Sequence, residues 1–279
     1  MIKCSKAIIT ASGYGTRRLP ITKAIDKCML PVGNRPLIDF VVADCLAAGV
    51  EDIYLIVSQG NDLIRSYYSP NPELEAHLRE AGKTAELAAV IPPAGVKFHF
   101  IDFDMSGKRG TAAAFAAARQ FIGADDYALC FTGDDFIYNR EGQSEAARLI
   151  EATEPGQSAM LGAPMDPNRL ASYGVIVTHE SGGRQVFDHI QEKPPAGEAK
   201  GELINVSKYL FHGSFFAELD RTMEGDPTKA GEYYITDPIN AYVAAGHSLQ
   251  VVEAAGRYLD GGTLDGWLKA NQIVIAEQR

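Results

Sequence analysis

The sequence is poor in cysteine and lacks the spacings by which cysteine and histidine hold metals. Its four cysteines are scattered with no CxxC pair, so neither a zinc site nor a disulfide framework is indicated, and buried, reduced thiols are expected. The six histidines show no HxH or HExxH spacing, which argues against a histidine metal site. The cysteines are Cys4, Cys28, Cys45 and Cys130.

Long apolar runs are also absent. No stretch approaches the roughly 20 apolar residues that a membrane-spanning helix requires, and no apolar signal core follows Lys3 at the N-terminus. The 26 basic residues are outnumbered by 36 acidic ones, and the formal net charge of −10 argues against a general nucleic-acid surface. We therefore expect a cytoplasmic protein without a membrane or nucleic-acid partner, in which any phosphate-binding charge is local.

The chain of 279 residues, 46% hydrophobic and 22% charged, has the composition of one compact globular domain. Strand-like and helix-like segments alternate over its first half, which is typical of an α/β layered fold with a mostly parallel sheet. The second half is more antiparallel, with a hairpin turn at Gly182-Gly183. The expected strands are 7–10, 53–57, 96–101, 127–131, 158–163, 174–177, 185–190, 203–211 and 249–253, and the main expected helices are 36–48, 72–87, 111–121, 215–223, 236–245 and 264–277.

The most informative stretch follows the first expected strand. Gly13 and Gly15 stand in a loop with Arg17, and Lys27 follows further on. Closely spaced glycines let successive backbone N–H groups turn toward one anion, and the cations add full charges, so the stretch suits phosphate binding. A dinucleotide loop is disfavoured because Arg18 stands where its third glycine belongs, and this strand end has no Walker sequence. A plain tight turn is the alternative to a phosphate cradle.

A longer sequence pattern that contains this loop is more informative than the two glycines alone. Residues 13–31 read GxGTRxLPxTKAIxKxMLP, and in this the chain resembles the nucleotidyltransferases that make nucleotide sugars, most closely the bacterial UTP:glucose-1-phosphate uridylyltransferases. The likeness extends over nearly the whole chain. The other matching segments are Pro36, Gly110, Gly133-Asp134, Tyr173-Gly174-Val175, Glu192-Lys193-Pro194, Tyr234-Ile235-Thr236-Asp237 and Tyr258-Leu259-Asp260-Gly261-Gly262.

The resemblance implies a Rossmann-like three-layer nucleotidyltransferase fold with a mixed, mostly parallel central sheet. It implies a nucleotide-binding half at residues 1–135, and a sugar-binding half with the C-terminal helix at residues 136–279. The implied reaction is the Mg²⁺-dependent formation of UDP-glucose and pyrophosphate from UTP and glucose 1-phosphate. Members of the family form dimers and tetramers, so a homo-oligomer is expected.

The resemblance also assigns site residues. Arg17 would contact the triphosphate and the departing pyrophosphate, Lys27 the phosphates undergoing transfer, and Lys193 the sugar phosphate, which makes these three the expected catalytic residues. Magnesium takes oxygen ligands and commonly only one or two protein carboxylates, a demand that Asp134 and Asp260 fit. The expected sugar-binding residues are Gly174, Glu192 and Lys193, and the expected nucleotide-binding residues are Ala11, Ser12, Gly13, Gly15, Thr16 and Gly110.

The chain departs from the family's pattern around the nucleobase and the sugar. Cys28 stands where a glutamate commonly follows the lysine, and residues 102–111 lack the usual glutamine. Ser207 replaces a glycine before a later strand. Another nucleotide such as dTTP or CTP, or another sugar 1-phosphate, therefore stays open, as does a non-catalytic regulator that binds nucleotide sugars. Of the neighbouring acids Asp134 and Asp135, the second is expected to be structural.

Overall fold

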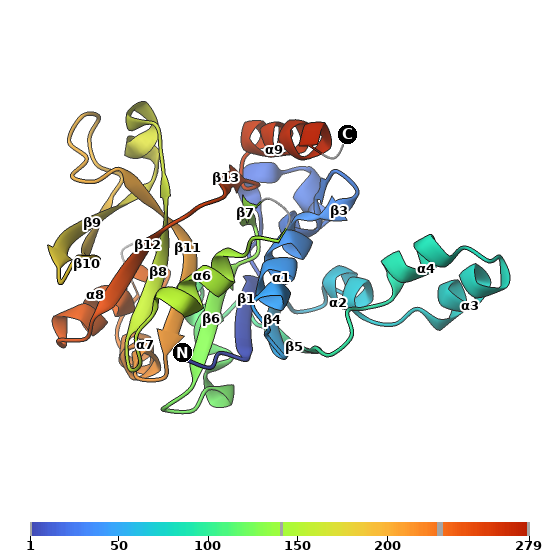
Figure 1. Cartoon of the computed structure of the whole chain (residues 1–279), viewed down its shortest axis with the longest axis horizontal. Helices are drawn as coiled ribbons and strands as arrows, with labels where there is room; N and C mark the ends of the chain where they lie inside the picture. The colour runs from blue at the N-terminus through green and yellow to red at the C-terminus, as the bar shows by residue number, and fades with distance from the viewer. Residues whose placement is uncertain (1, 140–141, 228–230, 278–279) are drawn as a thin grey trace.

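A nine-stranded sheet runs through the protein in the computed structural model, which describes residues 2–139, 142–227 and 231–277 (Figure 1). Its central strands β1 and β6 are buried along almost their whole length, because their apolar residues run nearly without interruption and face a layer on each side. The strand order is β5 (Lys97–Phe103), β4 (Asp52–Ser58), β1 (Lys6–Ala11), β6 (Tyr127–Thr132), β11 (Leu203–His212), β8 (Ser158–Pro164), β12 (Leu249–Glu253), β10 (Arg184–Glu192) and β9 (Gly174–Ser181).

The direction of the strands changes along the sheet. Strands β5, β4, β1 and β6 pair in parallel, as do β8 and β12. Strands β11 and β10 are antiparallel to their neighbours, so seven of the nine strands point one way and two point the other. The expected mixed, mostly parallel sheet is confirmed, and the hairpin turn at Gly182-Gly183 joins β9 to β10 as expected.

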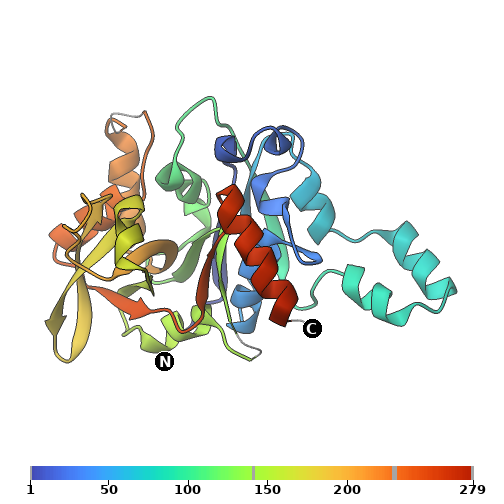
Figure 2. The same ribbon diagram turned by 90° about the horizontal axis from the view of Figure 1, so that it is seen from above.

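Helices cover both faces of the sheet and produce three layers (Figures 1 and 2). Alternating residues of β1 divide between the two layers: Ala7 and Ile9 join one buried cluster, and Ile8 joins the other. The first cluster packs against α1 (Leu37–Ala47), α6 (Glu145–Ala152) and α9 (Leu264–Glu277), and the second against α5 (Thr111–Ala116), α7 (Phe215–Glu224) and α8 (Thr236–Ala244).

Two expected helices differ from the structure. The stretch 72–87 forms two helices, α3 (Pro72–Glu80) and α4 (Thr84–Val90), because Gly82 takes a left-handed backbone with φ of 68° that interrupts the helix. With α2 (Leu63–Tyr68) between them and the sheet, they extend away from the body in both views (Figures 1 and 2). The stretch 111–121 is helical only to Ala116 and continues as a 3₁₀ turn at Arg119–Phe121.

A small two-stranded ribbon, absent from the sequence-based expectation, sits beneath the last helix. Its strands are β7 (Asp135–Tyr138) and β13 (Arg257–Asp260), which pair antiparallel so that Asp260 lies opposite Asp135. Helix α9 follows β13 and packs on the short hairpin of β2 (Pro31–Val32) and β3 (Arg35–Pro36), where Trp267 Nε1 donates to Pro31 O at 2.7 Å. The end of the chain therefore contacts the end of the glycine-loop signature.

The expected burial of the cysteines is confirmed. All four cysteines are free and buried, and burial raises the pKa of the Cys4 thiol to about 11. Within the described ranges, no helix combines the length and the apolar character needed to cross a membrane.

Candidate active site

A cleft of about 480 Å³ opens at the carboxyl ends of β1 and β6, where open α/β sheets bind ligands. It collects most of the residues expected at the nucleotide and the metal. Those that line it are Ser12, Gly13, Gly15, Thr16, Arg17, Lys27, Gly110 and Asp134.

The glycine loop is both a tight turn and a wall of this cleft. Gly15 has a φ of 63°, and its carbonyl oxygen accepts a hydrogen bond from Thr22 Oγ1 at 2.8 Å. A Cβ atom placed on Gly13 would lie 3.1 Å from Lys27 Nζ, so glycine lets the lysine approach the backbone closely. The two interpretations of the loop, turn and cradle, therefore describe one structure.

Lys27 and Asp134 form an ion pair at the floor of the cleft. Lys27 Nζ lies 2.6 Å from Asp134 Oδ2, with side-chain exposures of 20% and 18%. Burial alone would raise the pKa of Asp134, but Lys27, Lys208 and Arg17 outweigh it and hold that pKa below its usual range. Burial likewise opposes the charge on Lys27, yet Asp134 raises the lysine pKa above its usual value. Both groups are therefore charged at neutral pH.

Asp135 points into a different network. Its Oδ1 accepts from Lys208 Nζ at 2.7 Å and from Thr132 Oγ1 at 3.0 Å, and its Oδ2 accepts from Tyr258 Oη at 3.1 Å. Both carboxylate oxygens thus hold neighbouring strands together, as expected of a structural residue. Asp134 differs, because its Oδ1 has no hydrogen-bond partner among the described residues.

Asp260 approaches the cleft from β13. Its Oδ1 accepts from Gly262 N at 2.7 Å and its Oδ2 from Thr263 Oγ1 at 3.1 Å. A Cβ on Gly262 would lie 2.9 Å from Arg17 Nη2 and 3.1 Å from Asp260 Oδ1, so guanidinium and carboxylate meet around this glycine. The structure therefore brings Arg17 and Asp260 together, although Asp260 itself does not line the described cavity.

The three expected sugar-binding residues lie together on the β9–β10 hairpin. Glu192 pairs with Gly174 across the two strands, and Lys193 follows with a φ of 44° and donates its N–H to Tyr173 O at 3.1 Å. Glu192 and Lys193 are exposed, and none of the three lines the 480 Å³ cavity. Ala11 is also outside that lining, because it is buried inside β1.

Ser207 is a cleft residue that sequence reasoning did not assign to the site. It has a left-handed φ of 51° at an irregularity of β11, and its N–H donates to Asn205 Oδ1 at 3.0 Å. Tyr209 Oη donates to the same oxygen at 3.0 Å. Its replacement of a family glycine is the signal that could have identified it, because left-handed backbone is where glycine is favoured. Phe103, Met105, Glu232 and Tyr234 are among the other lining residues that were not expected.

The carboxylates fit a magnesium ion that also binds phosphates. Among the described residues, no group of three or more His, Cys, Asp or Glu could hold a metal by itself. Magnesium commonly uses one or two carboxylates and completes its shell with water and substrate phosphates. The unpartnered Oδ1 of Asp134 is one available ligand, and the oxygens of Asp260 each accept a single hydrogen bond and keep a lone pair.

Comparison with known proteins extends these observations. A family model described as nucleotidyl transferase matches residues 6–277. A UTP--glucose-1-phosphate uridylyltransferase of Mycoplasma pneumoniae is 31% identical over 275 residues, which cover 97% of this chain and 92% of the relative. One from Bacillus subtilis is 33% identical over 243 residues, covering 86% and 80%. A solved structure of UTP-bound UGPase from Acinetobacter baumannii superposes with a TM-score of 0.86 at 25% identity, over 99% of this chain and 94% of that one.

Proposed function

The chain belongs to the nucleotidyl transferase family, and from this premise we propose that it joins UTP to glucose 1-phosphate, forming UDP-glucose and releasing pyrophosphate. Relatives that carry the name UTP--glucose-1-phosphate uridylyltransferase match it over most of both chains. The structural observation that best supports this function is the 2.6 Å ion pair of Lys27 and Asp134 beside the glycine loop. Such a pair offers a cation to phosphates and a carboxylate to a metal ion.

The reaction joins two polyanions. A phosphate oxygen of glucose 1-phosphate attacks the α-phosphorus of UTP, and pyrophosphate leaves with the electrons of the broken P–O bond. Positioning and charge stabilisation supply most of the catalysis in such a transfer. Two unit charges 4 Å apart interact by about 4 kcal/mol at an effective dielectric near 20. Cations fixed at the reacting phosphates therefore have a decisive effect on the rate.

Two cations of the cleft are proposed to act on the phosphates. Lys27 would contact the phosphates undergoing transfer, and Arg17 the triphosphate and the pyrophosphate that leaves. The backbone of residues 11–16 and Gly110 would hold the nucleotide. Asp134 keeps the Lys27 ammonium in place before substrate binds, since the two atoms are 2.6 Å apart.

Asp134 and Asp260 are proposed to hold Mg²⁺. A bound Mg²⁺ would act as a Lewis acid that polarises the α-phosphate. The unpartnered Asp134 Oδ1 and the approach of Asp260 to Arg17 around Gly262 support this assignment. Substrate phosphates would complete the coordination.

The sugar side is proposed to use the β9–β10 hairpin. Lys193 would bind the sugar phosphate, Glu192 would accept hydrogen bonds from sugar hydroxyls, and Gly174 would offer its backbone. A substrate extending from the cleft toward the end of β10 would meet these residues, which lie next to one another there.

A second candidate function uses dTTP or CTP, or another sugar 1-phosphate. The observation that favours it is the burial of Cys28, which is fully covered and does not line the cleft. A glutamate commonly follows this lysine in the family the chain resembles, so with a cysteine here the base must be recognised by other groups.

A turnover panel of UTP, dTTP, CTP and ATP against several sugar 1-phosphates tests both candidates. We expect UTP with glucose 1-phosphate to give the highest kcat/KM. Failure of UTP with every sugar phosphate would refute the uridylyl assignment, and failure of all nucleotides would favour a non-catalytic regulator.

We also propose that residues 1–279 act as one domain, because a single sheet takes strands from both halves of the chain. The enzyme is proposed to work in the cytoplasm as a homo-oligomer, a dimer or a tetramer. Sedimentation at micromolar concentration checks the last point.

A further inference from the structure

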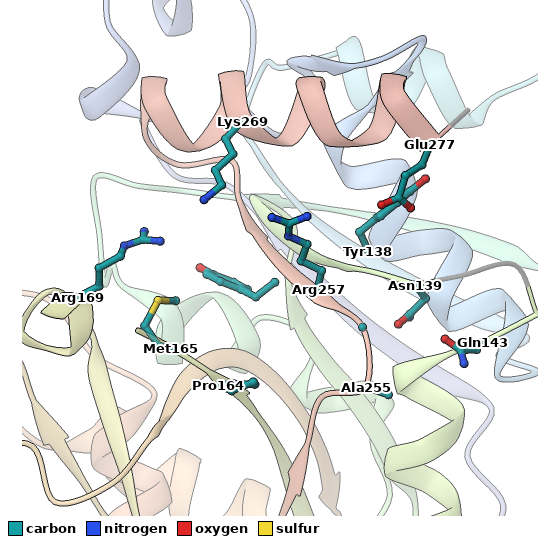
Figure 3. Close-up of a pocket in the computed structure, with 12 residues that line it drawn as sticks. Tyr138, Asn139, Gln143, Pro164, Met165, Arg169, Ala255, Arg257, Lys269 and Glu277 are labelled. Carbon is teal, nitrogen blue, oxygen red and sulfur yellow. The ribbon is translucent and has the colours of Figure 1, made fainter. Parts of the chain in front are cut away.

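A second cavity lies beneath α9. It has a volume of about 600 Å³ and is bounded by the ends of β7 and β8, by the 3₁₀ helix η5 (Pro167–Ser172), by β13 and by α9 (Figure 3). Among the described residues, the two cavities share no lining residue. Tyr258 lies next to both cavities. It lines this one, and its hydroxyl donates to Asp135 in the wall of the cleft.

Positive charge collects in this cavity, although the chain as a whole carries a net charge of −10. Among the described residues, Arg169, Arg257 and Lys269 line it, against one carboxylate, Glu277. Within the described part of the chain none of the three cations has an ion-pair partner, and only Arg169 makes a side-chain hydrogen bond, to Tyr173 Oη at 2.9 Å. Unpaired cations around a concave surface attract anions, because the low-dielectric walls concentrate their field.

The opposite side of the cavity offers amides. In Figure 3, Asn139 and Gln143 lie away from Arg169 and Lys269, with Arg257 between the two groups. Asn139 Oδ1 is buried and has no hydrogen-bond partner among the residues that the structure describes. A buried acceptor left without a donor is unfavourable, so a ligand hydroxyl that donates to it from the cavity would be stabilised.

We propose that this cavity binds a phosphorylated sugar or polyol. The phosphoryl group lies among Arg169, Arg257 and Lys269, and the hydroxyl groups reach the amides of Asn139 and Gln143. Arginine suits a phosphoryl group because its planar fork donates two parallel hydrogen bonds. The volume falls within the range of about 300–1,000 Å³ that is usual for small-molecule sites. An inorganic anion fits the cations alone and leaves the amide side unused.

Isothermal titration calorimetry with glucose 6-phosphate tests this proposal. The full-length protein is first saturated with UDP-glucose, so that the catalytic cleft is occupied. A separate titration checks that UDP-glucose itself binds, which keeps a failure of the proposed function distinguishable from a failure of this inference. We expect one glucose 6-phosphate site per chain under these conditions.

Matched variants locate the site. The double variant Arg257→Gln/Lys269→Gln should bind glucose 6-phosphate at least tenfold more weakly, because two of three charge-assisted contacts are lost. The control Lys83→Gln/Lys97→Gln removes the same charge at exposed positions between α3 and α4 and on β5, and should bind within twofold of the parent. All four positions are exposed, so circular dichroism should show folded proteins.

The results test both parts of the proposal, the phosphoryl contacts with the cations and the hydroxyl contacts with the amides. Loss of binding in the double variant alone supports the site. Absence of binding to the saturated parent, or equal binding by the double variant, overturns it. Inorganic phosphate serves as the second probe, and we expect it to bind at least tenfold more weakly than glucose 6-phosphate. Equal affinity would refute the part of the proposal that assigns the hydroxyl groups to the amides.

Discussion

Lys27 of the catalytic cleft and the cations of the cavity beneath α9 are held in opposite ways. In the cleft, Lys27 is about four-fifths covered and lies 2.6 Å from a carboxylate. In the cavity, Arg257 and Lys269 are exposed and have no carboxylate partner among the described residues. Tyr258 links the two regions, because it lines the cavity and its hydroxyl donates to Asp135 in the wall of the cleft.

This difference follows from the free energy of desolvation. A buried cation without a partner costs several kcal/mol, so a lysine that must stay charged on the floor of a cleft needs a buried carboxylate. An exposed cation keeps its water and needs no partner. The cleft is therefore organised before any ligand arrives, whereas the cavity presents charges that a ligand would be the first to pair.

The largest expected effect is on the free energy of unfolding, and it distinguishes the catalytic cleft from the cavity beneath α9. Lys27→Met should destabilise the protein by about 3 kcal/mol at pH 7, the low end for breaking a buried pair, because Lys208 and Arg17 still face Asp134. In the parent the folded-state pKa of Asp134 lies below its unfolded value, so its stabilisation is present at neutral pH and is lost as the pH falls through the folded value. The difference between the two proteins, measured by urea unfolding, should therefore persist down to about pH 4, the ordinary pKa of an aspartate, and shrink below it. A constant difference would contradict the pairing argument.

The turnover number kcat tests the same comparison between the cleft and the cavity. Lys27→Ala should lower kcat by at least about 100-fold, as is typical of losing one preorganised group that stabilises charge. Lys269→Ala, which removes a lysine from the other cavity, should leave kcat within about twofold without added ligand. Steady-state assays with UTP, glucose 1-phosphate and Mg²⁺ measure both. An unchanged rate for Lys27→Ala would refute its assigned role.

A smaller effect is expected at the boundary between the regions. Tyr258→Phe removes the hydroxyl that donates to Asp135 Oδ2, and a hydrogen bond of this kind contributes about 1 kcal/mol. The control is Tyr138→Phe on the paired strand, because the Tyr138 hydroxyl has no hydrogen-bond partner among the described residues. Thermal unfolding should show a lower Tm only for the first variant. Equal Tm values would mean that this hydrogen bond adds nothing.

The smallest effect is expected in the cavity. Arg257→Gln should change the free energy of unfolding by no more than about 0.5 kcal/mol, since the exposed guanidinium has no ion pair to lose. Chemical unfolding at low and high salt measures this. A loss of 2 kcal/mol would show that Arg257 stabilises the fold and would remove the contrast with Lys27.

Much of the sheet could be predicted from the sequence. Strand β1 and the loop after it are specified by adjacent residues, because the apolar run, the glycines and the arginines are contiguous. The ribbon of β7 and β13 could not be found in this way. Its strands have four residues each and pair across more than a hundred positions, so neither length nor periodicity reveals them.

The features of the candidate site likewise divide into those that the sequence predicts and those that depend on residues distant in the chain. The family pattern pointed to Lys27 and Asp134, but the ion pair between them joins residues 107 positions apart. The left-handed turn at Ser207 was indicated only by the family glycine that the serine replaces, because a serine itself gives little local indication of such a backbone. The distinction between Asp134 and Asp135 was expected, and the structure supplies its reason in Lys208 and Tyr258.

The sequence by itself determined the family, the α/β layering and the glycine loop, since each is encoded in residues that are neighbours along the chain. Only the tertiary structure decided which charges are paired, which carboxylate oxygen is available, and that a second charged cavity lies beneath α9. The physical reason is that local periodicity fixes the face on which a side chain lies, whereas its partner depends on the packing of elements distant in sequence.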